Sequence, residues 1–384
     1  MRILAAGDHF VRPDLIRAAL DEELALRSPA APLDPPGPLG PPEPLASLDP
    51  LDPRRAAAPA DGPRLDVTDL VLPWPHEPFG PVGGVQEASG TEQRLIDALG
   101  GAEVCVTQMA PFTARVFEAS PALRMVAVCR GGPVNVDLDA ATRHGVAVSF
   151  APGRNAPAAA EFAIGLMLAA MRRIPTADAE LKQGRWRGDF YAYDESGGEL
   201  DGATVGLVGY GAIGRIVARV LLAFGAKVLA ADPYADPEAV RADGVQPVGL
   251  DDLLRRSSVV SLHARLTAET HHLIDAERLA LLPEGAVLVN SARGALLDHA
   301  PLPGLLRSGR LRALALDVYD VEPPPADWPL HDAPNVVTAP HLAGATRQTA
   351  HRAAAITAAE VGRFLRGEAL AHPANPEVAE GPRP

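Results

Sequence analysis

Short apolar runs and longer runs with helical spacing alternate along most of the chain. Residues 2–7 (RILAAG), 102–109 (AEVCVTQM) and 123–130 (LRMVAVCR) have the length and composition of buried strands, and residues 13–26 and 91–99 have patterns typical of helices. Successive parallel strands need a crossover connection, which is usually a helix, and the crossovers cover both faces of the sheet. The alternation therefore predicts the α/β class with parallel sheets.

The alternation continues in the second half of the chain. A helix is predicted over residues 157–174, and because apolar residues surround most of its circumference we expect it to be buried in a core or against a second subunit. A long final helix over residues 345–366 can return to the first domain, which would make that domain discontinuous. Further strands are predicted in the segments TVGLV, KVLAA, SSVVSLHA, GAVLVN, LRALALD and NVVTAP.

Residues 29–63 have a composition unlike the rest of the chain. They are rich in proline and alanine and poor in larger apolar residues. Such a segment cannot bury enough apolar surface to offset the entropy of ordering it. We therefore expect an extended or disordered proline-rich insertion.

The overall composition narrows the partners and the compartment. Of the 384 residues, 47 % are hydrophobic, but no apolar run reaches the roughly 18 residues that suggest a membrane span. The formal net charge of −13 argues against nucleic acid or an anionic membrane as a partner. Cys105 and Cys129 lie in apolar runs without metal-ligand spacing. We expect reduced core thiols, no metal site and a cytoplasmic location.

The segment TVGLVGYGAIG has the features of a dinucleotide-binding turn. A predicted buried strand over Thr204–Val208 is followed by Gly209, Gly211 and Gly214, and a helix is predicted over Arg215–Phe224. The first glycine permits the tight turn, the second lets the backbone approach a pyrophosphate, and the third lets the helix pack closely on the strand. The N-terminus of the helix offers free amides and the positive end of its dipole to the phosphates.

Asp232 indicates which dinucleotide is bound. It ends the next predicted strand, where a carboxylate can accept hydrogen bonds from a ribose diol. A carboxylate there repels the 2′-phosphate of NADP, and Pro233 and Tyr234 bring no compensating cation. We therefore expect NAD as the cofactor. A structural glycine turn without a nucleotide is the alternative interpretation of the motif.

Polar residues gather where the predicted strands of this half end. His263, Arg293, Asp317 and His341 each follow an apolar strand, and Glu322 lies in the loop after Asp317. In a doubly wound sheet the ligand binds beyond the carboxyl ends of the strands. Hydride transfer at an alcohol carbon needs a base for the hydroxyl proton, a carboxylate that orients the base, and a cation for the acid group of the substrate. His341, Glu322 and Arg293 fit these three roles.

Four segments of the chain resemble the signature blocks of the D-isomer-specific 2-hydroxyacid dehydrogenases, a family that includes phosphoglycerate dehydrogenase and hydroxypyruvate reductase. They occur in the family's order, together with the glycine motif, and the resemblance covers most of the chain after the proline-rich insertion. The four segments are SLHARLTAETHHLI, LLPEGAVLVNSARGALLDHAPL, ALDVYDVEPPP and VVTAPHLAGAT.

The resemblance implies a role for each residue of the constellation. His341 is the acid/base catalyst and is paired with Glu322, Arg293 grips the carboxylate and carbonyl of the substrate, and Asp317 lies near the nicotinamide carboxamide. The resemblance also implies a homodimer formed through the NAD domain. The cofactor-binding positions that the motif and the resemblance indicate are Gly209, Tyr210, Gly211, Ala212, Ile213, Gly214, Asp232, His263, Ala292, Asp317, His341 and Gly344.

The substrate loop of the first domain departs from the family pattern. Members usually carry a loop like RAGTGVDNVD, whose amides hold the substrate carboxylate, whereas this chain has the shorter RGGPVNVD at residues 130–137. Anchoring of the loop is an alternative role for Arg130. The loop at residues 72–84 also differs, so the particular 2-hydroxy acid is not identified. The candidate substrate-binding residues are Arg130, Gly131, Gly132 and Arg293.

These observations predict an α/β fold with two doubly wound parallel-sheet domains. A Rossmann NAD domain over residues 155–340 is inserted in a flavodoxin-like substrate domain made of residues 1–154 and 341–384. The predicted function is NAD-dependent hydride transfer between nicotinamide and the alpha carbon of a small D-2-hydroxy acid or 2-keto acid, the D stereochemistry following from the resemblance alone. Glu322 disfavours a formate dehydrogenase. A non-enzymatic NAD(H)-binding sensor or corepressor on the same fold is the alternative.

Overall fold

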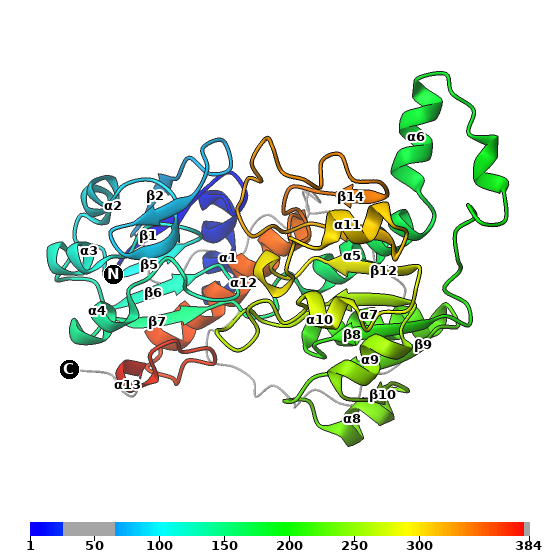
Figure 1. Cartoon of the computed structure of the whole chain (residues 1–384). Coiled ribbons are helices and arrows are strands. Elements are labelled where there is room, and N and C mark those ends of the chain that lie inside the picture. Colours follow the sequence, from blue (N-terminus) through cyan, green and yellow to red (C-terminus); the bar gives the residue numbers. More distant parts are fainter. Residues whose placement is uncertain (26–65, 380–384) are drawn as a thin grey trace. The chain divides into compact units, whose positions relative to one another are not determined.

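The computed structural model describes residues 1–25 and 66–379 (Figure 1). The expected insertion at residues 29–63 lies outside these ranges. No helix within them is both long enough and apolar enough to span a membrane. The chain divides into two compact units, unit 1 (Met1–Arg154 with Arg347–Pro384) and unit 2 (Asn155–Thr346).

Unit 1 is built on a five-stranded parallel sheet in the order β2-β1-β5-β6-β7. The direction of winding reverses at β1, which is the flavodoxin-like arrangement expected from the sequence. All five strands run the same way, so their carboxyl ends meet at one edge of the sheet. The strands are β1 (Arg2–Gly7), β2 (Asp66–Val71), β5 (Val104–Thr107), β6 (Met125–Val128) and β7 (Ala147–Phe150), and an antiparallel hairpin of β3 (Gly80–Val82) and β4 (Val85–Ala88) follows β2.

Both faces of the unit 1 sheet are apolar because helices cover both (Figure 1). In β1, Ile3 and Ala5 belong to one cluster of buried side chains and Leu4 and Ala6 to another, as the two-residue period of a strand requires. Helices α1 and α12 pack against each other and contribute to the first cluster, whereas α2, α3 and α4 contribute to the second. The helices are α1 (Pro13–Ala25), α2 (Glu92–Leu99), α3 (Ala114–Ala119), α4 (Leu138–Arg143), α12 (Arg347–Leu365) and α13 (Pro376–Ala379).

Unit 2 is built on a seven-stranded parallel sheet in the order β10-β9-β8-β11-β12-β13-β14. The order reverses between β8 and β11, which is the Rossmann arrangement, with its ligand crevice at the carboxyl ends of the strands. The strands are β8 (Thr204–Val208), β9 (Lys227–Ala231), β10 (Gln246–Pro247), β11 (Val259–Leu262), β12 (Ala286–Asn290), β13 (Leu311–Leu316) and β14 (Val336–Thr338).

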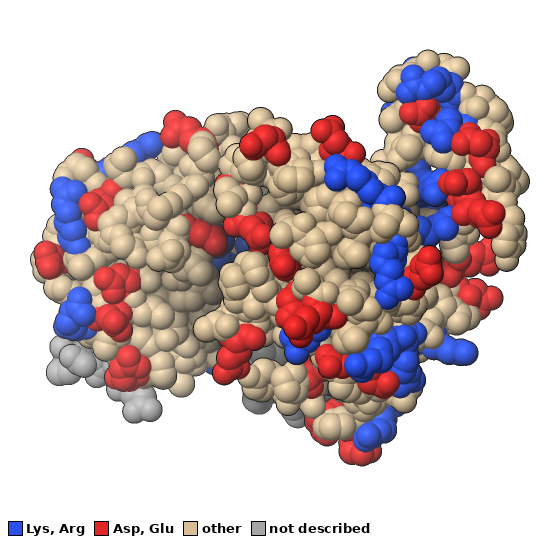
Figure 2. Space-filling model, viewed as in Figure 1, with Lys and Arg blue, Asp and Glu red and all other residues tan. Residues whose placement is uncertain are grey.

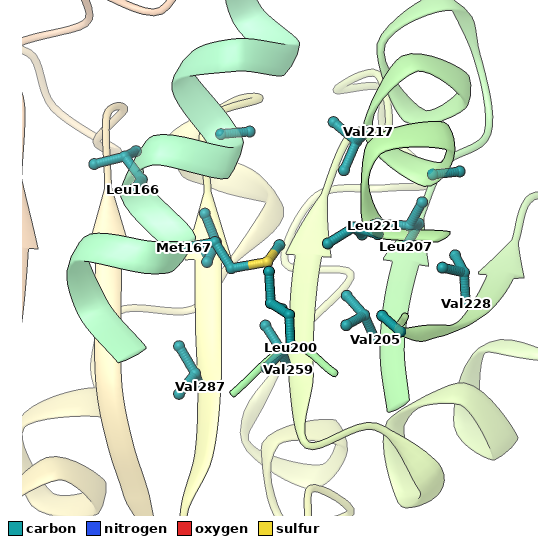
Figure 3. Packing of buried hydrophobic residues seen from close by; sticks show 14 of the residues in the cluster. Leu166, Met167, Leu200, Val205, Leu207, Val217, Leu221, Val228, Val259 and Val287 are labelled. Atoms are coloured by element: carbon teal, nitrogen blue, oxygen red, sulfur yellow. The ribbon is translucent and has the colours of Figure 1, made fainter. Parts of the chain in front are cut away.

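The two faces of the unit 2 sheet bury separate clusters. Helices α5 and α7 cover one face, where Met167 and Leu221 pack over Val205 and Val259 (Figure 3). Helices α9, α10 and α11 contribute to the cluster on the other face. The helical segments are α5 (Ala156–Met171), α6 (Ile174–Lys182), α7 (Ala212–Ala223), α8 (Pro237–Ala242), α9 (Leu250–Arg256), α10 (Ala276–Leu279), α11 (Leu302–Arg307) and the 3-10 turns η2 (Gly188–Tyr191) and η3 (Gly294–Leu296).

Several boundaries differ from those expected, and three of the differences have a clear local cause. Helix α7 begins at Ala212 rather than Arg215, because Gly211 is its N-cap and the glycine motif itself forms the first turn. The apolar helix ends at Met171, since the backbone turns into the left-handed region at Arg173, where φ is 53°. The chain returns to unit 1 after Thr346 instead of at residue 341, because the His341 segment is hydrogen-bonded to the end of β13.

Candidate active site

His341 and Glu322 form a direct pair at the carboxyl edge of the unit 2 sheet. The Nδ1 atom of His341 lies 2.7 Å from Oε2 of Glu322. The other oxygen, Oε1, accepts a hydrogen bond of 3.0 Å from the Tyr319 amide. The His341 side chain is 43 % exposed, so its ring is held on one side by Glu322 and is open on the other. A histidine held in this way can exchange a proton through Nε2.

The carboxylate of Glu322 is ionised at neutral pH. Burial raises its pKa, but the hydrogen bond and charge of His341, the Tyr319 amide and the charge of Arg293 together outweigh burial and hold the pKa below its ordinary value. An ionised carboxylate can accept a hydrogen bond from Nδ1 of the imidazole and fix the orientation of the ring. The pair is therefore suited to a histidine that gains and loses a proton during a reaction.

Asp317 holds the backbone that carries His341. Its side chain is completely buried, and its two oxygens accept hydrogen bonds of 2.7 and 2.8 Å from the amides of Leu342 and Ala343. The carbonyl oxygen of Asp317 also accepts from the His341 amide at 2.9 Å. Burial raises the pKa of this carboxyl, although both amide bonds oppose the shift. Asp317 thus links the end of β13 to the loop after β14 by hydrogen bonds.

Arg293 extends from a tight turn after β12. Asn290 closes this turn, because its Nδ2 donates to the Arg293 carbonyl at 2.9 Å and its Oδ1 accepts from the Ala292 amide at 3.1 Å. A Cβ on Gly294 would lie 2.0 Å from the Tyr319 carbonyl carbon, so only glycine lets the two loops touch. This contact brings the exposed Arg293 into the electrostatic neighbourhood of Glu322.

The glycine turn has the shape that a bound pyrophosphate needs. Gly209 has φ of 97°, and a Cβ there would lie 2.6 Å from the Ala264 nitrogen. A Cβ on Gly214 would lie 2.5 Å from the Gly209 oxygen, so that glycine permits close packing of α7 on β8. Beside Gly211, in contrast, a Cβ would meet nothing within 4 Å. This open backbone stands at the N-terminus of α7, where free amides attract phosphate, and the residues therefore fit NAD.

Asp232 connects the glycine turn to the end of β9. Its Oδ2 accepts a hydrogen bond of 2.7 Å from the Tyr210 amide, and its Oδ1 accepts one of 2.9 Å from the Tyr234 amide. The Tyr210 hydroxyl donates to Oδ2 of Asp243 at 3.0 Å. A hollow of about 450 Å³ lies beside Asp232, lined also by Pro233, Arg241 and Val248. Each carboxylate oxygen can accept more than one hydrogen bond, so a ribose diol has acceptors here.

His263 is placed for a backbone role. Its amide donates to the Val208 carbonyl at 2.7 Å, which fixes the end of β11 against β8. Burial lowers the pKa of its imidazole to about 4. The ring is therefore neutral at physiological pH, and it is a poor proton donor there.

Arg130, Gly131 and Gly132 follow β6 at the carboxyl edge of the unit 1 sheet. The Arg130 guanidinium forms an ion pair with Glu87. A Cβ on either glycine would meet nothing within 4 Å, so the backbone of this loop has free space beside it. The structure thus places this candidate substrate loop in unit 1, and the pair of His341 and Glu322 with Arg293 in unit 2.

Two residues that position the site were given no role from the sequence. Asn290 closes the turn that carries Arg293, and Tyr319 binds Glu322 through its amide and the Ala339 carbonyl through its hydroxyl, at 2.9 Å. A buried asparagine at the end of an apolar strand is a signal that sequence reasoning can use. Tyr319 carries no such signal, because the contact to Glu322 comes from its backbone.

Residues 164–343 match the model of the D-isomer specific 2-hydroxyacid dehydrogenase family, NAD binding domain. A glyoxylate reductase of Korarchaeum cryptofilum is 37 % identical over 295 residues, which are 77 % of this chain and 89 % of that protein. The chain belongs to the D-isomer-specific 2-hydroxyacid dehydrogenases. Unit 2 contains the family's NAD-binding domain, as the glycine motif predicts.

Other relatives and structures agree with this assignment. D-3-phosphoglycerate dehydrogenase of Mycobacterium tuberculosis is 40 % identical over 308 residues, which are 80 % of this chain but 57 % of that protein, so the chain spans little more than half of that relative. A crystal structure of a Thermus thermophilus protein superposes with a TM-score of 0.72 at 28 % identity, covering 97 % of this chain and 100 % of that one. D-2-hydroxyisocaproate dehydrogenase shares the fold, with a TM-score of 0.75 at 24 % identity over 98 % of this chain and 100 % of that one.

Proposed function

We propose that the protein is an NAD-dependent dehydrogenase that interconverts a small D-2-hydroxy acid and its 2-keto acid. The observation that carries the proposal is the 2.7 Å contact between His341 and an ionised Glu322, with Arg293 on the adjoining loop. NAD, when bound, supplies or accepts the hydride at the alpha carbon. Family membership and the open glycine turn support the same reaction.

Each residue of the trio has a defined task in this reaction. Glu322 engages Nδ1 of His341, so Nε2 is the nitrogen that exchanges a proton with the substrate oxygen. In the reducing direction His341 donates a proton to the keto oxygen, and in the oxidising direction it accepts the hydroxyl proton. Arg293 binds the substrate carboxylate through two parallel hydrogen bonds and polarises the carbonyl.

The cofactor is held by the carboxyl edge of the unit 2 sheet. The amides of Ala212 and Ile213 at the start of α7 would bind the pyrophosphate, and Asp232 would bind the adenosine ribose. The negative charge of Asp232 disfavours a 2′-phosphate, so NAD is preferred over NADP. His263 and Ala292 line the site through their backbone. Tyr210, Gly209, Gly214 and Gly344 shape it, and Asp317 holds the loop that presents His341.

In unit 1, the loop of Arg130, Gly131 and Gly132 is proposed to bind substrate. A Cβ on either glycine would meet nothing within 4 Å, which supports close approach of a carboxylate to this backbone. Arg130 already pairs with Glu87, so it also anchors the loop. The buried, free thiols of Cys105 and Cys129 are consistent with a cytoplasmic location, which we propose for the protein.

The reaction is tested by following NADH absorbance with a panel of 2-keto acids, including glyoxylate, hydroxypyruvate, pyruvate and phosphohydroxypyruvate, with NADPH run in parallel. Turnover that an Arg293→Gln variant loses, while NADH still binds, supports the proposal. An Arg307→Gln variant changes an arginine of α11 in the same unit and should retain activity. NADH binding without turnover on any acid would instead favour an NAD(H)-binding sensor.

We also propose that two copies associate through an arm of unit 2, residues 172–199, which carries α6 and η2. No residue of α6 is buried, and Figure 1 shows this helix standing away from the sheet of its own unit. Charged side chains of both signs gather on the projecting segment (Figure 2). Among them stand Trp186, Tyr191 and Tyr193, which are 86 %, 93 % and 94 % exposed. Aromatic rings of this kind are enriched in interfaces.

The dimer is tested by sedimentation of the wild type and of a Trp186→Ser, Tyr191→Ser double variant. The wild type should sediment as a dimer and the double variant as a monomer. Tyr234→Ser removes an exposed ring outside the arm and should leave the dimer intact. The core face of helix α5 is buried against α7, β12 and β13, whereas Phe162, Ile164 and Leu168 of the same helix are only partly buried.

A further inference from the structure

Three arginines of unit 1 meet at the carboxyl edge of its sheet. Arg130 follows β6, Arg154 follows β7, and Arg352 lies on α12. The Arg130 carbonyl accepts from the Ala151 amide at 2.7 Å, and Arg352 donates from Nε to the Arg154 carbonyl at 2.8 Å. These bonds fix the two strand-end loops and the helix against one another. We call Arg130, Arg154 and Arg352 the arginine cluster.

Arg154 is charged, and two of its three guanidinium nitrogens have no hydrogen-bond partner among the described residues. Its Nε and Nη1 atoms are shielded from solvent, and neither has a hydrogen-bond partner in the part of the chain that the structure describes. Burial lowers the pKa of Arg154 to about 10, with the charge of Arg130 acting in the same direction. The guanidinium therefore keeps its charge at neutral pH. A buried charge with unfilled hydrogen bonds is strongly unfavourable unless a counter-ion reaches it.

The nearby carboxylates do not meet this need. Glu87 pairs with Arg130. Asp8 directs Oδ1 to the amides of Phe10 and Val11 at 2.8 and 2.9 Å, and its Oδ2 is buried without a partner. Burial raises the pKa of Asp8 to about 6, even though Arg154 and Arg130 lower it. Asp8 is thus close enough to interact with Arg154 electrostatically but does not hydrogen-bond to it.

This arrangement runs against the charge of the whole chain, which is −13. A group of arginines with one direct acidic partner makes a local positive potential in an acidic protein. Guanidinium groups match carboxylate and phosphate oxygens in a two-pronged geometry. We propose that the arginine cluster is a binding site for a small oxyanion, a phosphate or a carboxylate group, with Arg154 as its principal ligand.

The site is tested by thermal unfolding of the full chain with increasing inorganic phosphate, and separately malonate, at constant ionic strength. The wild type should be stabilised saturably. Arg154→Met should weaken the apparent affinity by about tenfold or more, the equivalent of one good charged contact. Arg143→Met removes an exposed charge from α4 of the same unit and should behave like the wild type.

Two results would overturn the proposal. One is a wild type that phosphate and malonate do not stabilise, which would mean that internal water satisfies Arg154. The other is equal stabilisation of the wild type and Arg154→Met. If the methionine variant does not fold, Arg154→Lys provides the comparison: it keeps the charge but loses the two-pronged geometry, so its affinity for phosphate should fall while that of Arg143→Met does not.

Inhibition kinetics identify the source of the anion. If phosphate competes with the keto acid, the cluster binds an acid group of the substrate itself. If phosphate binds without competing, the cluster binds a second molecule. Only this kinetic measurement rests on the proposed dehydrogenase activity. The unfolding measurements stand without it, so failure of the anion site and failure of the proposed reaction are distinguishable.

Discussion

Two groups of polar side chains, one at the carboxyl edge of each sheet, differ in how their hydrogen bonds are satisfied. Around His341 in unit 2 the groups bind one another: Glu322 uses both oxygens, and so does Asp317. At the edge of unit 1, Asp8 and Arg154 each keep buried atoms without a partner. A closed network of hydrogen bonds fixes the orientation of a catalytic side chain. An open set of buried donors is instead suited to a ligand that completes it.

The largest expected effect is at the closed network. His341→Ala removes the proton-transfer group, and kcat should fall by about 10²- to 10⁴-fold, the range typical of general acid–base catalysis. The affinity for NADH, measured by fluorescence titration, should change little. His271→Ala, at an exposed histidine of the same unit, is the control and should keep full activity. Substantial activity in the His341 variant would remove this histidine from the proton-transfer step.

At the carboxyl edge of unit 1, we expect the stability of the folded protein to depend on pH through Asp8. Asp8 has a pKa near 6 in the folded protein and an ordinary value of 3.8. Because the pKa of Asp8 is higher in the folded protein than in the unfolded chain, protonation of Asp8 stabilises the folded protein. This stabilisation is fully present below pH 3.8 and is lost as the pH rises through about 6. A pKa difference of about two units corresponds to a loss of up to about 3 kcal/mol in the free energy of unfolding.

Asp8→Asn should remove this loss, since the amide oxygen can still accept from Phe10 and Val11. Chemical denaturation between pH 4 and pH 7, in buffers without phosphate, measures it. The wild type should lose stability over this interval relative to the variant. Parallel curves for the two proteins would show that Asp8 titrates at its ordinary pKa.

The expectations from sequence were strongest where a pattern is local. The glycine motif and the strands around it were predicted because strand, turn and helix follow one another within one segment. His341 and Arg293 became candidates because each follows an apolar strand, and Glu322 because it lies in the loop after Asp317. The contact of Asp317 with the amides of Leu342 and Ala343 joins residues far apart in the chain, and no local pattern encodes it.

The same reason explains what was missed in unit 1. Arg154 is one arginine in the loop PGRN, and the sequence does not tell whether its guanidinium is buried or paired. The hairpin of β3 and β4 was also missed, because its strands are too short for a two-residue period to emerge. Burial and pairing are properties of the packed chain. They are therefore the properties that distinguish the two edges and that sequence patterns describe least.

A smaller effect tests how tightly the loops of the closed network must touch. Gly294→Ala places a methyl group against the Tyr319 backbone, which should cost about 2 kcal/mol of unfolding free energy as overpacking. The shift of the Arg293 loop should also lower kcat/KM. Gly304→Ala, in α11, adds a methyl group to open space and should be neutral or slightly stabilising. Equal stability of the two variants would mean that the Arg293 and Tyr319 loops can move apart without a cost in stability.

The smallest expected effect concerns the glycine turn of unit 2. Tyr210→Phe removes the hydrogen bond to Asp243 but keeps the buried ring and the amide that binds Asp232. A single hydrogen bond of this kind contributes about 1 kcal/mol. KM for NADH should therefore rise several-fold while kcat is unchanged, because the hydroxyl positions the turn and lies outside the proton-transfer pair. A fall in kcat with unchanged KM would show instead that the turn and the His341 network act as one unit.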